Sequence, residues 1–532
     1  FPVLKMLARV QAAAMLWPQQ YLLAWSCTVL PLKLLALAAS EATLQVEGAR
    51  WTLTTQQMPW VDKGVLRPGP PPSANESGTL EVLTDRELQE FHGFGACFNE
   101  LGWLALQTIS ETSREEILGK LFDPSQMGLA YNRVPIGAND YANGWYSHDE
   151  MPYGQTDLHQ EHFSIERDKQ ILIPYIRAAQ KYLQKRASNS PTHLFASAWS
   201  PPEWMKLNHQ YSACNRFLPF VSSSDPNTLN FTADVQRSYA LYLSKFVDAY
   251  YSEGIHVSAV MVQNEPCDGG FCAPWLSYPK AFWTGKQMRD FIADYLGPRF
   301  AQDHGPTSES PCEVWLGTLN CKDFGAYPNT VLSDPAASKY VSGVAFQWDG
   351  KAAIGQTHRT WPHLDLIQSE NECGDGENTW YYGMYVFDLI HHYFHNGARA
   401  YVYWNPVLGT EKGESHWGWK QNSMMTILEG RVTLNPEFYV MMHFSHFVQP
   451  PARHLGLRGD WADRAVAFRT TGVDREEQIV VVVCNREASP RDFTLTVEAV
   501  GFRVTLPPES FSTFVIPPAV LSERRLPENQ FI

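Results

Sequence analysis

The sequence predicts an α/β fold, a (β/α)8 TIM barrel with a discontinuous all-β sandwich formed by the N- and C-terminal segments. Two patterns support this prediction. Eight short apolar runs alternate with longer amphipathic segments over about 340 residues, which matches the strand number and size of such a barrel. After residue 434 the pattern changes to short strand-like segments separated by turn residues, which is typical of an all-β module.

The barrel is predicted to be inserted between two parts of the sandwich. Strand-like segments at 42–54 and 79–84 have no partner in the barrel scheme, so we assign them to the same module as the C-terminal strands. The whole chain of 532 residues has room for a barrel and one smaller companion. We expect a leader at 1–39, N-terminal strands of the sandwich at 40–90, the barrel at 91–433, the remaining sandwich at 434–520 and a tail at 521–532.

Each barrel strand is expected where a short apolar run is bounded by polar or turn residues. Segments with helical periodicity lie between these runs, for example at 110–121 and 235–251. The predicted barrel strands cover 91–98, 129–136, 193–198, 257–263, 314–319, 343–347, 364–368 and 398–404. The predicted C-terminal strands of the sandwich cover 465–469, 478–484, 493–497, 502–506 and 512–516.

The N-terminal segment predicts export. Residues 16–39 are largely apolar, and Ala36 and Ala38 form a small-residue pattern of the kind that signal peptidase cleaves. Retention as an N-terminal membrane anchor is the alternative, although Pro31 and Lys33 interrupt the apolar run. Sequons at Asn75 and Asn230 agree with an exported protein.

The cysteines also suit an oxidising compartment. One of the nine, Cys27, lies in the predicted leader, and the other eight form an even number. Proximity along the chain favours local bridges between Cys267 and Cys272 and between Cys312 and Cys321, but the spacing does not establish the pairing. No CxxC or HExxH spacing is present, so we expect no metal and no cofactor.

The composition excludes some partners and favours others. A net charge of −14 argues against a nucleic-acid partner and against a polybasic membrane anchor. Aromatic residues make up 13% of the chain and include 18 tryptophans. Flat rings stack on the apolar faces of sugars, so this population suits a carbohydrate site, although any single ring could belong to the core.

Two glutamates follow predicted barrel strands. Glu265 comes after the fourth run, between Asn264 and Pro266, and Glu370 comes after the seventh. Catalytic groups of TIM barrels lie at the C-terminal ends of the strands, so both carboxyl groups should face one mouth. Retaining glycoside hydrolysis needs two carboxyl groups about 5–5.5 Å apart, one a protonated acid and the other an ionised nucleophile. The sequence therefore predicts a retaining β-glycosidase.

Six segments in this order resemble glycoside hydrolase family 30, which includes lysosomal glucosylceramidase and endo-β-1,6-glucanases. They are His92–Glu100, Asn132–Pro135, Ala198–Trp204, Val262–Pro266, Gln368–Gly374 and Tyr403–Asn405. The resemblance extends over residues 42–516. It implies a β-glucoside, glucan or glycolipid substrate, which could lie at a membrane surface, and a secreted or lysosomal location.

The resemblance also implies roles for individual residues. Glu265 would be the acid/base and Glu370 the nucleophile, with Glu372 as the competitor because strand alternation places it on the same side. Arg133 would orient a catalytic carboxylate and keep it ionised, although a purely structural ion pair is the alternative. Substrate contacts are implied for Arg133, Asn139, Asp140, Trp199, Asn264, Trp348, Trp404 and Asn405.

One segment departs from the glucosylceramidase pattern. That enzyme carries His-Trp-Tyr after the sixth strand, where this sequence has Gln347, Trp348 and Asp349. Residues 347–351, 370–375 and 417–422 look more like microbial members, including the β-1,6-glucanase branch. Alternatives are the same mechanism on a β-xyloside, β-fucoside or β-galactoside, and an inactive barrel that only binds carbohydrate. The sequence predicts neither the aglycone nor the oligomeric state.

Overall fold

The computed structural model describes residues 48–518 and 520, apart from 74–75, 187–191, 213–226, 268–277 and 473–475. The described residues contain a parallel barrel and a largely antiparallel sheet, which belong to one compact unit. The predicted leader, the predicted tail and the sequon at Asn75 lie outside the described residues.

The barrel has eight parallel strands, and each overlaps a run predicted from the sequence. The strands are β4 (Gly93–Ala96), β5 (Tyr131–Ile136), β6 (His193–Ala198), β7 (Ala259–Met261), β8 (Glu313–Leu319), β9 (Val341–Gln347), β10 (Asp365–Glu370) and β11 (Ala400–Tyr403). Hydrogen bonds close the barrel between β4 and β5. The N–H of Ala130 donates to the Phe94 carbonyl at 2.9 Å, and the N–H of Phe98 donates to the Arg133 carbonyl at 2.8 Å. The predicted TIM barrel is confirmed.

Side chains fill the barrel interior. Tyr131, Phe195, Met261, Trp315 and Ile367 come from five different strands, form one buried cluster and are at most 3% exposed. Since the interior is solid, a substrate has access only at an end of the barrel, as is usual for this fold.

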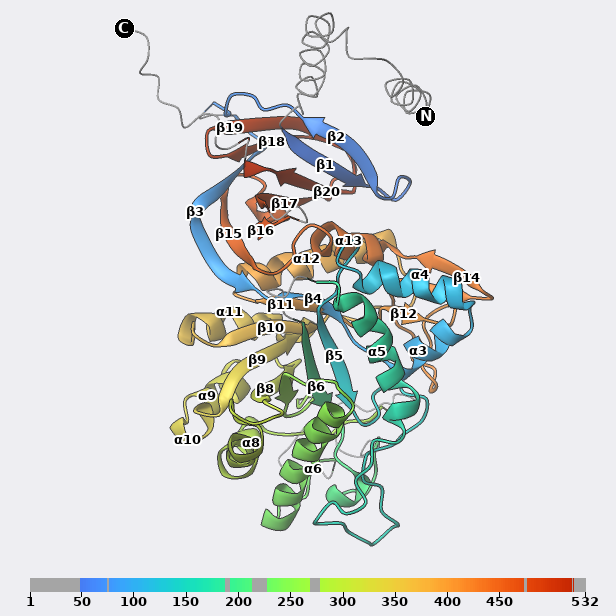
Figure 1. Cartoon of the computed structure of the whole chain (residues 1–532). Helices are drawn as coiled ribbons and strands as arrows, with labels where there is room; N and C mark the ends of the chain where they lie inside the picture. Colours follow the sequence, from blue (N-terminus) through green and yellow to red (C-terminus); the bar gives the residue numbers. More distant parts are fainter. Residues whose placement is uncertain are drawn as a thin grey trace, which may run out of the picture. The chain divides into compact units, whose positions relative to one another are not determined.

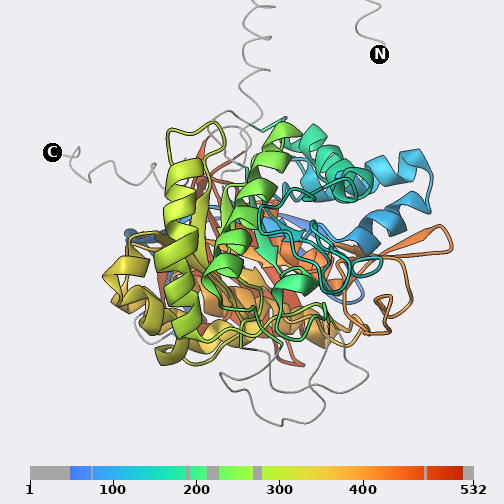
Figure 2. The ribbon, with the colours of Figure 1, turned by 90° about the horizontal axis from the view of Figure 1, so that it is seen from below.

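Helices surround the strands, as Figures 1 and 2 show. They are α3 (Glu100–Gln107), α4 (Glu111–Phe122), α5 (Leu172–Leu183), α6 (Ala233–Ser252), α7 (Gly285–Phe291), α8 (Gly297–Asp303), α9 (Thr330–Leu332), α10 (Pro335–Ser338), α11 (Lys351–Thr360), α12 (Trp380–His395) and α13 (Pro436–Ser445). In α6, Tyr239, Leu243 and Phe246 recur every three to four residues and form the buried face. Ser110 caps α4 by accepting a hydrogen bond from the N–H of Ser113.

A nine-stranded sheet combines strands from both ends of the described chain. The strands are β1 (Ala49–Thr54), β2 (Val61–Leu66), β3 (Thr79–Phe91), β15 (Ala452–Arg458), β16 (Ala465–Thr471), β17 (Glu477–Asn485), β18 (Arg491–Val497), β19 (Val500–Leu506) and β20 (Ser510–Ile516). β1 lies between β20 and β2, and β3 lies between β18 and β15 (Figure 1). The sheet folds over on itself, because the ring centres of Phe493 in β18 and Phe514 in β20 are 5.5 Å apart although these strands are not neighbours. The discontinuous sandwich is therefore confirmed.

The segment after residue 434 differs from the all-β prediction at its start. Residues Pro436–Ser445 form α13, and the next strand of the large sheet, β15, begins at Ala452. Asn435 is the residue before the helix and Pro436 its first residue, a pairing that favours helix initiation. A small sheet of β12 (Val407–Leu408), β13 (Met425–Leu428) and β14 (Arg431–Leu434) precedes it and was not predicted.

The disulfide pairing corrects the expectation of local bridges. Cys267 is bonded to Cys321, whereas Cys312 is a buried free thiol, and Cys272 lies outside the described residues. The reason is topological. β7 and β8 are neighbours in the barrel, so the residues that follow their C-terminal ends meet, although they are 54 positions apart in sequence.

Candidate active site

The two predicted catalytic glutamates lie at the same end of the barrel. Glu370 is the last residue of β10, and Glu265 follows the end of β7 by four residues. Both glutamates lie close to the buried thiol of Cys373. Burial raises the pKa of this thiol, and the negative charges of Glu370, Asp140 and Glu265 raise it further.

Glu265 has an unusual backbone conformation. Its φ is 47°, a left-handed value that residues with a side chain seldom adopt. Its N–H donates to the Thr318 carbonyl at 3.0 Å, which anchors this turn to the end of β8. Such backbone strain concentrates at functional sites, because the surrounding structure must stabilise it.

Glu370 is held through one of its two carboxylate oxygens. Nη1 of Arg133 donates to Oε2 at 2.5 Å, and Nε2 of Gln347 donates to the same oxygen at 3.0 Å. Oε1 receives no hydrogen bond from the described residues. The side chain of Glu370 is 7% exposed and that of Arg133 is 0% exposed, so this is a buried, charge-assisted contact. The arrangement fixes the carboxylate and leaves Oε1 for a ligand.

The charge of Glu370 depends on its neighbours. Burial raises the pKa of Glu370, the positive charge of Arg133 opposes this rise and the negative charge of Asp140 adds to it, and together they bring the pKa to about 7. Burial also raises the pKa of Asp140 to about 6. Arg133 therefore favours the ionised form of Glu370.

Arg133 contacts several strand ends at once. Its Nε donates to Oγ of Ser197 at 2.9 Å and its Nη2 donates to Oδ1 of Asn264 at 2.6 Å. Its guanidinium carbon lies 4.4 Å from the ring centre of Trp199 and 5.4 Å from that of Trp404. These contacts satisfy a buried cation and keep Asn264 and Glu370 in a fixed relation.

The amide of Asn264 has a defined orientation. Its Oδ1 accepts from Arg133, from Nε2 of Gln347 at 2.7 Å and from Oγ1 of Thr318 at 2.8 Å. Three donors at one atom identify it as the oxygen. Nδ2 donates to no described residue, so it can donate to a bound ligand.

Glu265 meets a tyrosine that the sequence analysis did not single out. The hydroxyl of Tyr278 donates to Oε2 of Glu265 at 3.0 Å, and Glu265 is half-buried. The two glutamates therefore have different surroundings, an arginine for Glu370 and a tyrosine hydroxyl for Glu265. Different environments are what a pair of carboxyl groups with separate acid and base roles needs.

Glu372, the competitor for the nucleophile, has another partner. Its carboxylate is hydrogen-bonded to Tyr385, a residue of α12. The strand ends at Glu370, so the strand alternation that would place both glutamates on one side does not continue to Glu372.

Several predicted substrate contacts belong to an internal network. Nδ2 of Asn139 donates to Oδ1 of Asn99 at 2.6 Å, and Nδ2 of Asn99 donates to Oδ1 of Asn405 at 2.7 Å. Nδ2 of Asn405 donates to Gln421 at 2.9 Å, and Nε2 of Gln421 donates to Oδ2 of Asp140 at 3.3 Å. Asn139 and Asn405 are fully buried, whereas Asp140 is half-buried and can meet a ligand.

The predicted tryptophans lie in two settings. Trp199 and Trp404 stack with ring centres 5.5 Å apart and are 2% and 1% exposed. They cover Arg133 and leave little ring surface open. Trp348 is half-buried and begins a short 3-10 helix directly after β9.

No role was predicted from the sequence for three residues of this site, Gln347, Thr318 and Tyr278. Gln347 and Thr318 come from the C-terminal ends of β9 and β8, so their position after an apolar run was the available signal. Tyr278 comes after residues 268–277, and no pattern pointed to it.

Replacing Gln347 with leucine should lower kcat for an aryl β-glucoside by about 10–100-fold, with a smaller change in KM. The variant keeps a similar volume but removes a hydrogen bond to a charged group, worth about 1.5–3 kcal/mol. Gln89→Leu is the matched control, because Gln89 bonds to the carbonyls of Phe394 and Ala398, which belong to no part of this site. Equal losses in both variants would contradict a positioning role for Gln347.

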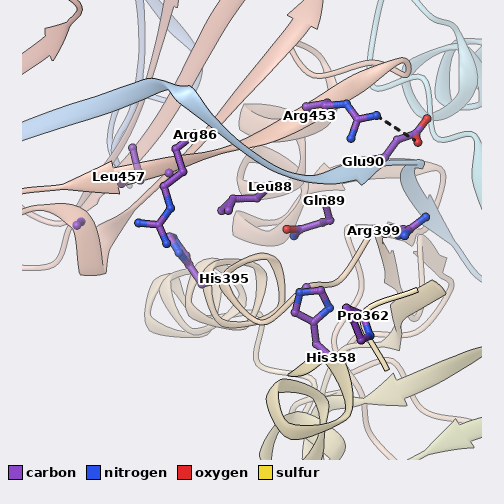
Figure 3. A pocket seen from close by; sticks show the side chains of 13 residues that line it. Arg86, Leu88, Gln89, Glu90, His358, Pro362, His395, Arg399, Arg453 and Leu457 are labelled. Atoms are coloured by element: carbon purple, nitrogen blue, oxygen red, sulfur yellow. Dashed lines mark ion pairs between the residues drawn. The ribbon is translucent and has the colours of Figure 1, made fainter. Parts of the chain in front are cut away.

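A separate pocket of about 630 Å³ lies between the large sheet and the barrel (Figure 3). Two of its three arginines are paired, Arg399 with Asp365 at 2.6 Å and Arg453 with Glu90 at 3.8 Å, so the pocket does not concentrate free positive charge. It includes none of the predicted site residues. Its lining consists of Arg86, Leu88, Gln89, Glu90, His358, Pro362, His395, Gly397, Arg399, Arg453, Gly456, Leu457 and Ala462.

The described residues contain no membrane-spanning helix and no cluster of potential metal ligands. No helix there is both long and apolar enough to cross a bilayer. In the same part of the chain, no group of three or more His, Cys, Asp or Glu side chains is placed to hold a metal ion.

Comparison with protein-family models gives two matches. Residues 91–448 match the glycosyl hydrolase family 30 TIM-barrel domain, and residues 464–514 match the glycosyl hydrolase family 30 β-sandwich domain. These matches cover both parts of the fold described above.

Individual relatives agree with these matches. Lysosomal acid glucosylceramidase of Mus musculus is 29% identical over 465 residues, which cover 82% of this chain and 83% of that protein. Endo-1,6-beta-D-glucanase neg1 of Aspergillus fumigatus is 27% identical over 399 residues, or 72% and 75% of the two chains. Among solved structures, SrfJ from Salmonella typhimurium superposes with a TM-score of 0.74 at 24% identity, covering 88% of this chain and 99% of that one, a likeness of fold.

Proposed function

The chain belongs to glycosyl hydrolase family 30 and is a glycoside hydrolase, and from this premise we propose that it hydrolyses β-glucosidic bonds with retention of configuration. The observation that carries the proposal is the anchoring of Glu370. Arg133 and Gln347 hold its Oε2, and no described residue donates to Oε1. A nucleophilic carboxylate needs one oxygen held in place and the other free of hydrogen bonds, so that it can attack the anomeric carbon.

In the first step, Glu370 and Glu265 act on opposite sides of one bond. Oε1 of Glu370 attacks the anomeric carbon while the protonated Glu265 gives its proton to the glycosidic oxygen. The bond between the anomeric carbon and that oxygen breaks, the aglycone leaves as an alcohol, and the sugar is bound to Glu370 as an ester. Nδ2 of Asn264 would donate to the sugar 2-hydroxyl.

In the second step, water displaces the Glu370 carboxylate from the anomeric carbon. Glu265, now ionised, takes a proton from a water molecule whose oxygen attacks the anomeric carbon. The ester bond breaks, Glu370 returns to its ionised form and Glu265 to its protonated form. Two inversions leave the product in the β configuration. Arg133 stabilises the leaving carboxylate of Glu370 through the 2.5 Å contact.

We propose a β-glucoside as the substrate, either a glucan or a glycolipid. The support comes from the relatives, which are named a glucosylceramidase and an endo-1,6-β-glucanase. Both names describe cleavage next to a glucose unit, and the second names a β linkage. The two relatives act on different aglycones, so the aglycone of this enzyme must be inferred from its own residues.

Replacing Glu265 with glutamine should lower kcat/KM for phenyl β-glucoside by about 10³-fold, the usual contribution of a general acid. For β-glucosyl fluoride the loss should stay below about tenfold, because fluoride leaves without protonation. Steady-state kinetics on both substrates measure this difference. Glu429→Gln is the matched control, since Glu429 lies in the exposed turn between β13 and β14. Equal losses on both substrates would argue against an acid role for Glu265.

We also propose that the protein is exported through the secretory pathway. The apolar residues 16–39, the disulfide between Cys267 and Cys321 and the lysosomal name of a relative support this. N-terminal sequencing of the mature protein should find a start after residue 38, and a retained leader would contradict cleavage.

A further inference from the structure

Three aromatic rings form a row that begins at Glu265. Tyr278 donates its hydroxyl to Glu265, and its ring centre lies 6.2 Å from that of Trp417, with 22° between the planes. The ring centre of Trp417 lies 5.5 Å from that of Trp419. All three residues are half-buried, so each exposes part of its side chain. We call Tyr278, Trp417 and Trp419 the aromatic shelf.

The two tryptophans of the shelf are fixed by a tight turn. The N–H of Ser415 donates to the Trp419 carbonyl at 2.8 Å, and Oγ of Ser415 accepts from the Trp419 N–H at 3.1 Å. Gly418 lies between the tryptophans with φ of 87°, a conformation that favours glycine. Nε1 of Trp417 donates to the Asp140 carbonyl at 3.1 Å. The rings are therefore ordered before any ligand binds, which lowers the entropic cost of binding.

The shelf lies on the side of the site where the leaving group is expected. Glu265, as acid, gives its proton to the oxygen of the aglycone, so the aglycone lies next to Glu265. Tyr278 contacts both Glu265 and Trp417, which makes the shelf a continuation of the site from that carboxyl group. Tyr278 also packs against the cluster of Trp199 and Trp404, but these two rings are buried against Arg133 and are at most 2% exposed, so they leave no ring face for a second sugar.

The surroundings of the shelf suit a sugar better than an alkyl chain. In the segment 411–420, every residue other than the two tryptophans is Glu, Lys, Gly, Ser or His, and His416 and Lys420 are exposed. A β-glucopyranosyl ring has C–H groups on its faces and hydroxyls around its edge, so its faces suit indole rings and its edge suits polar neighbours. A lipid aglycone would need a continuous apolar surface, which this segment does not offer.

We propose that the aromatic shelf binds a second sugar ring on the aglycone side of the scissile bond, so that the enzyme selects β-glucan oligosaccharides over glycolipids. This inference rests on the proposed function, because it takes Glu265 as the acid. It assigns the choice of aglycone to Trp417 and Trp419.

The test compares substrates with and without a second ring. Wild-type enzyme, Trp417→Leu and Trp419→Leu are assayed on a β-1,6-linked glucose trisaccharide, on β-glucosyl fluoride and on glucosylceramide in detergent micelles. In each variant, the ratio of kcat/KM for the trisaccharide to kcat/KM for the fluoride should fall by about tenfold or more, because a stacking contact is lost only where an aglycone ring exists. Trp361→Leu is the control, since Trp361 is half-buried at the end of α11.

The possible results distinguish a failure of the shelf proposal from a failure of the proposed function. A parallel loss on trisaccharide and fluoride would overturn the shelf as a sugar site and make it a structural element. A loss confined to glucosylceramide would also overturn it, in favour of a lipid aglycone. If wild-type enzyme does not hydrolyse β-glucosyl fluoride at all, the proposed function itself fails, a result that no change at the shelf can produce.

Discussion

Glu370→Gln should lower kcat for an aryl β-glucoside by about 10⁵-fold or more, because no other described carboxylate is held at this position to form the covalent intermediate. The amide keeps the shape of the side chain and its oxygen can still accept from Arg133, so the fold should be preserved, with some loss of stability because the buried Arg133 loses its counter-charge. Far-UV circular dichroism and thermal unfolding check the fold, and stopped assays with long incubation measure the residual rate.

Glu372→Gln is the matched control for this variant. Glu372 lies two residues along the chain, but its carboxylate is hydrogen-bonded to Tyr385 rather than to Arg133. We expect its kcat to stay within about tenfold of wild type, since no bond to substrate is lost. A larger loss in Glu372→Gln than in Glu370→Gln would reverse the two assignments.

Arg133→Met should lower the free energy of unfolding by about 3–5 kcal/mol, the usual cost of leaving a buried charge without its partner. Activity should fall as well, because Arg133 lowers the pKa of Glu370, and without it the pKa rises. The nucleophile must be ionised, so the acidic limb of the kcat/KM profile should move to higher pH. Denaturant titration and pH profiles measure the two effects.

Two further variants test whether the stability loss comes from the buried pair of Arg133 and Glu370. Arg458→Met removes an exposed arginine paired with Glu81 at 2.6 Å and should cost less than about 1 kcal/mol. The double variant Arg133→Met with Glu370→Gln should lose less stability than the sum of the single variants, because no unpaired charge remains. Strict additivity in that cycle would contradict a direct interaction between the two side chains.

The barrel could be predicted from the sequence because its strands are buried on both sides. Each therefore appears as a short apolar run, and the parallel topology then places the ends of runs four and seven at one mouth. Glu265 and Glu370 follow from that rule together with their motifs, whereas Arg133 was predicted from the family resemblance alone. The helix α13 was missed because it lies among strands, and composition alone did not separate the two.

Contacts between segments that are distant in the sequence could not be predicted in this way. Gln347 and Thr318 act through the orientation of Asn264 and Glu370, which depends on how three strand ends approach one another. The bond between Cys267 and Cys321 likewise follows from strand order in the barrel and not from spacing along the chain. The near-complete burial of Trp199 and Trp404 reflects stacking around Arg133, which no single motif reveals.

Trapping the covalent intermediate tests the central claim most directly. A 2-deoxy-2-fluoro-β-glucosyl fluoride has a good leaving group, while its 2-fluorine slows hydrolysis of the ester, so the sugar should accumulate on the nucleophile. Peptide mass spectrometry of the inactivated enzyme should place one fluoroglucosyl group on Glu370. An adduct on Glu372 or Glu265, or turnover that first releases the α-anomer of glucose from a β-glucoside, would contradict the mechanism.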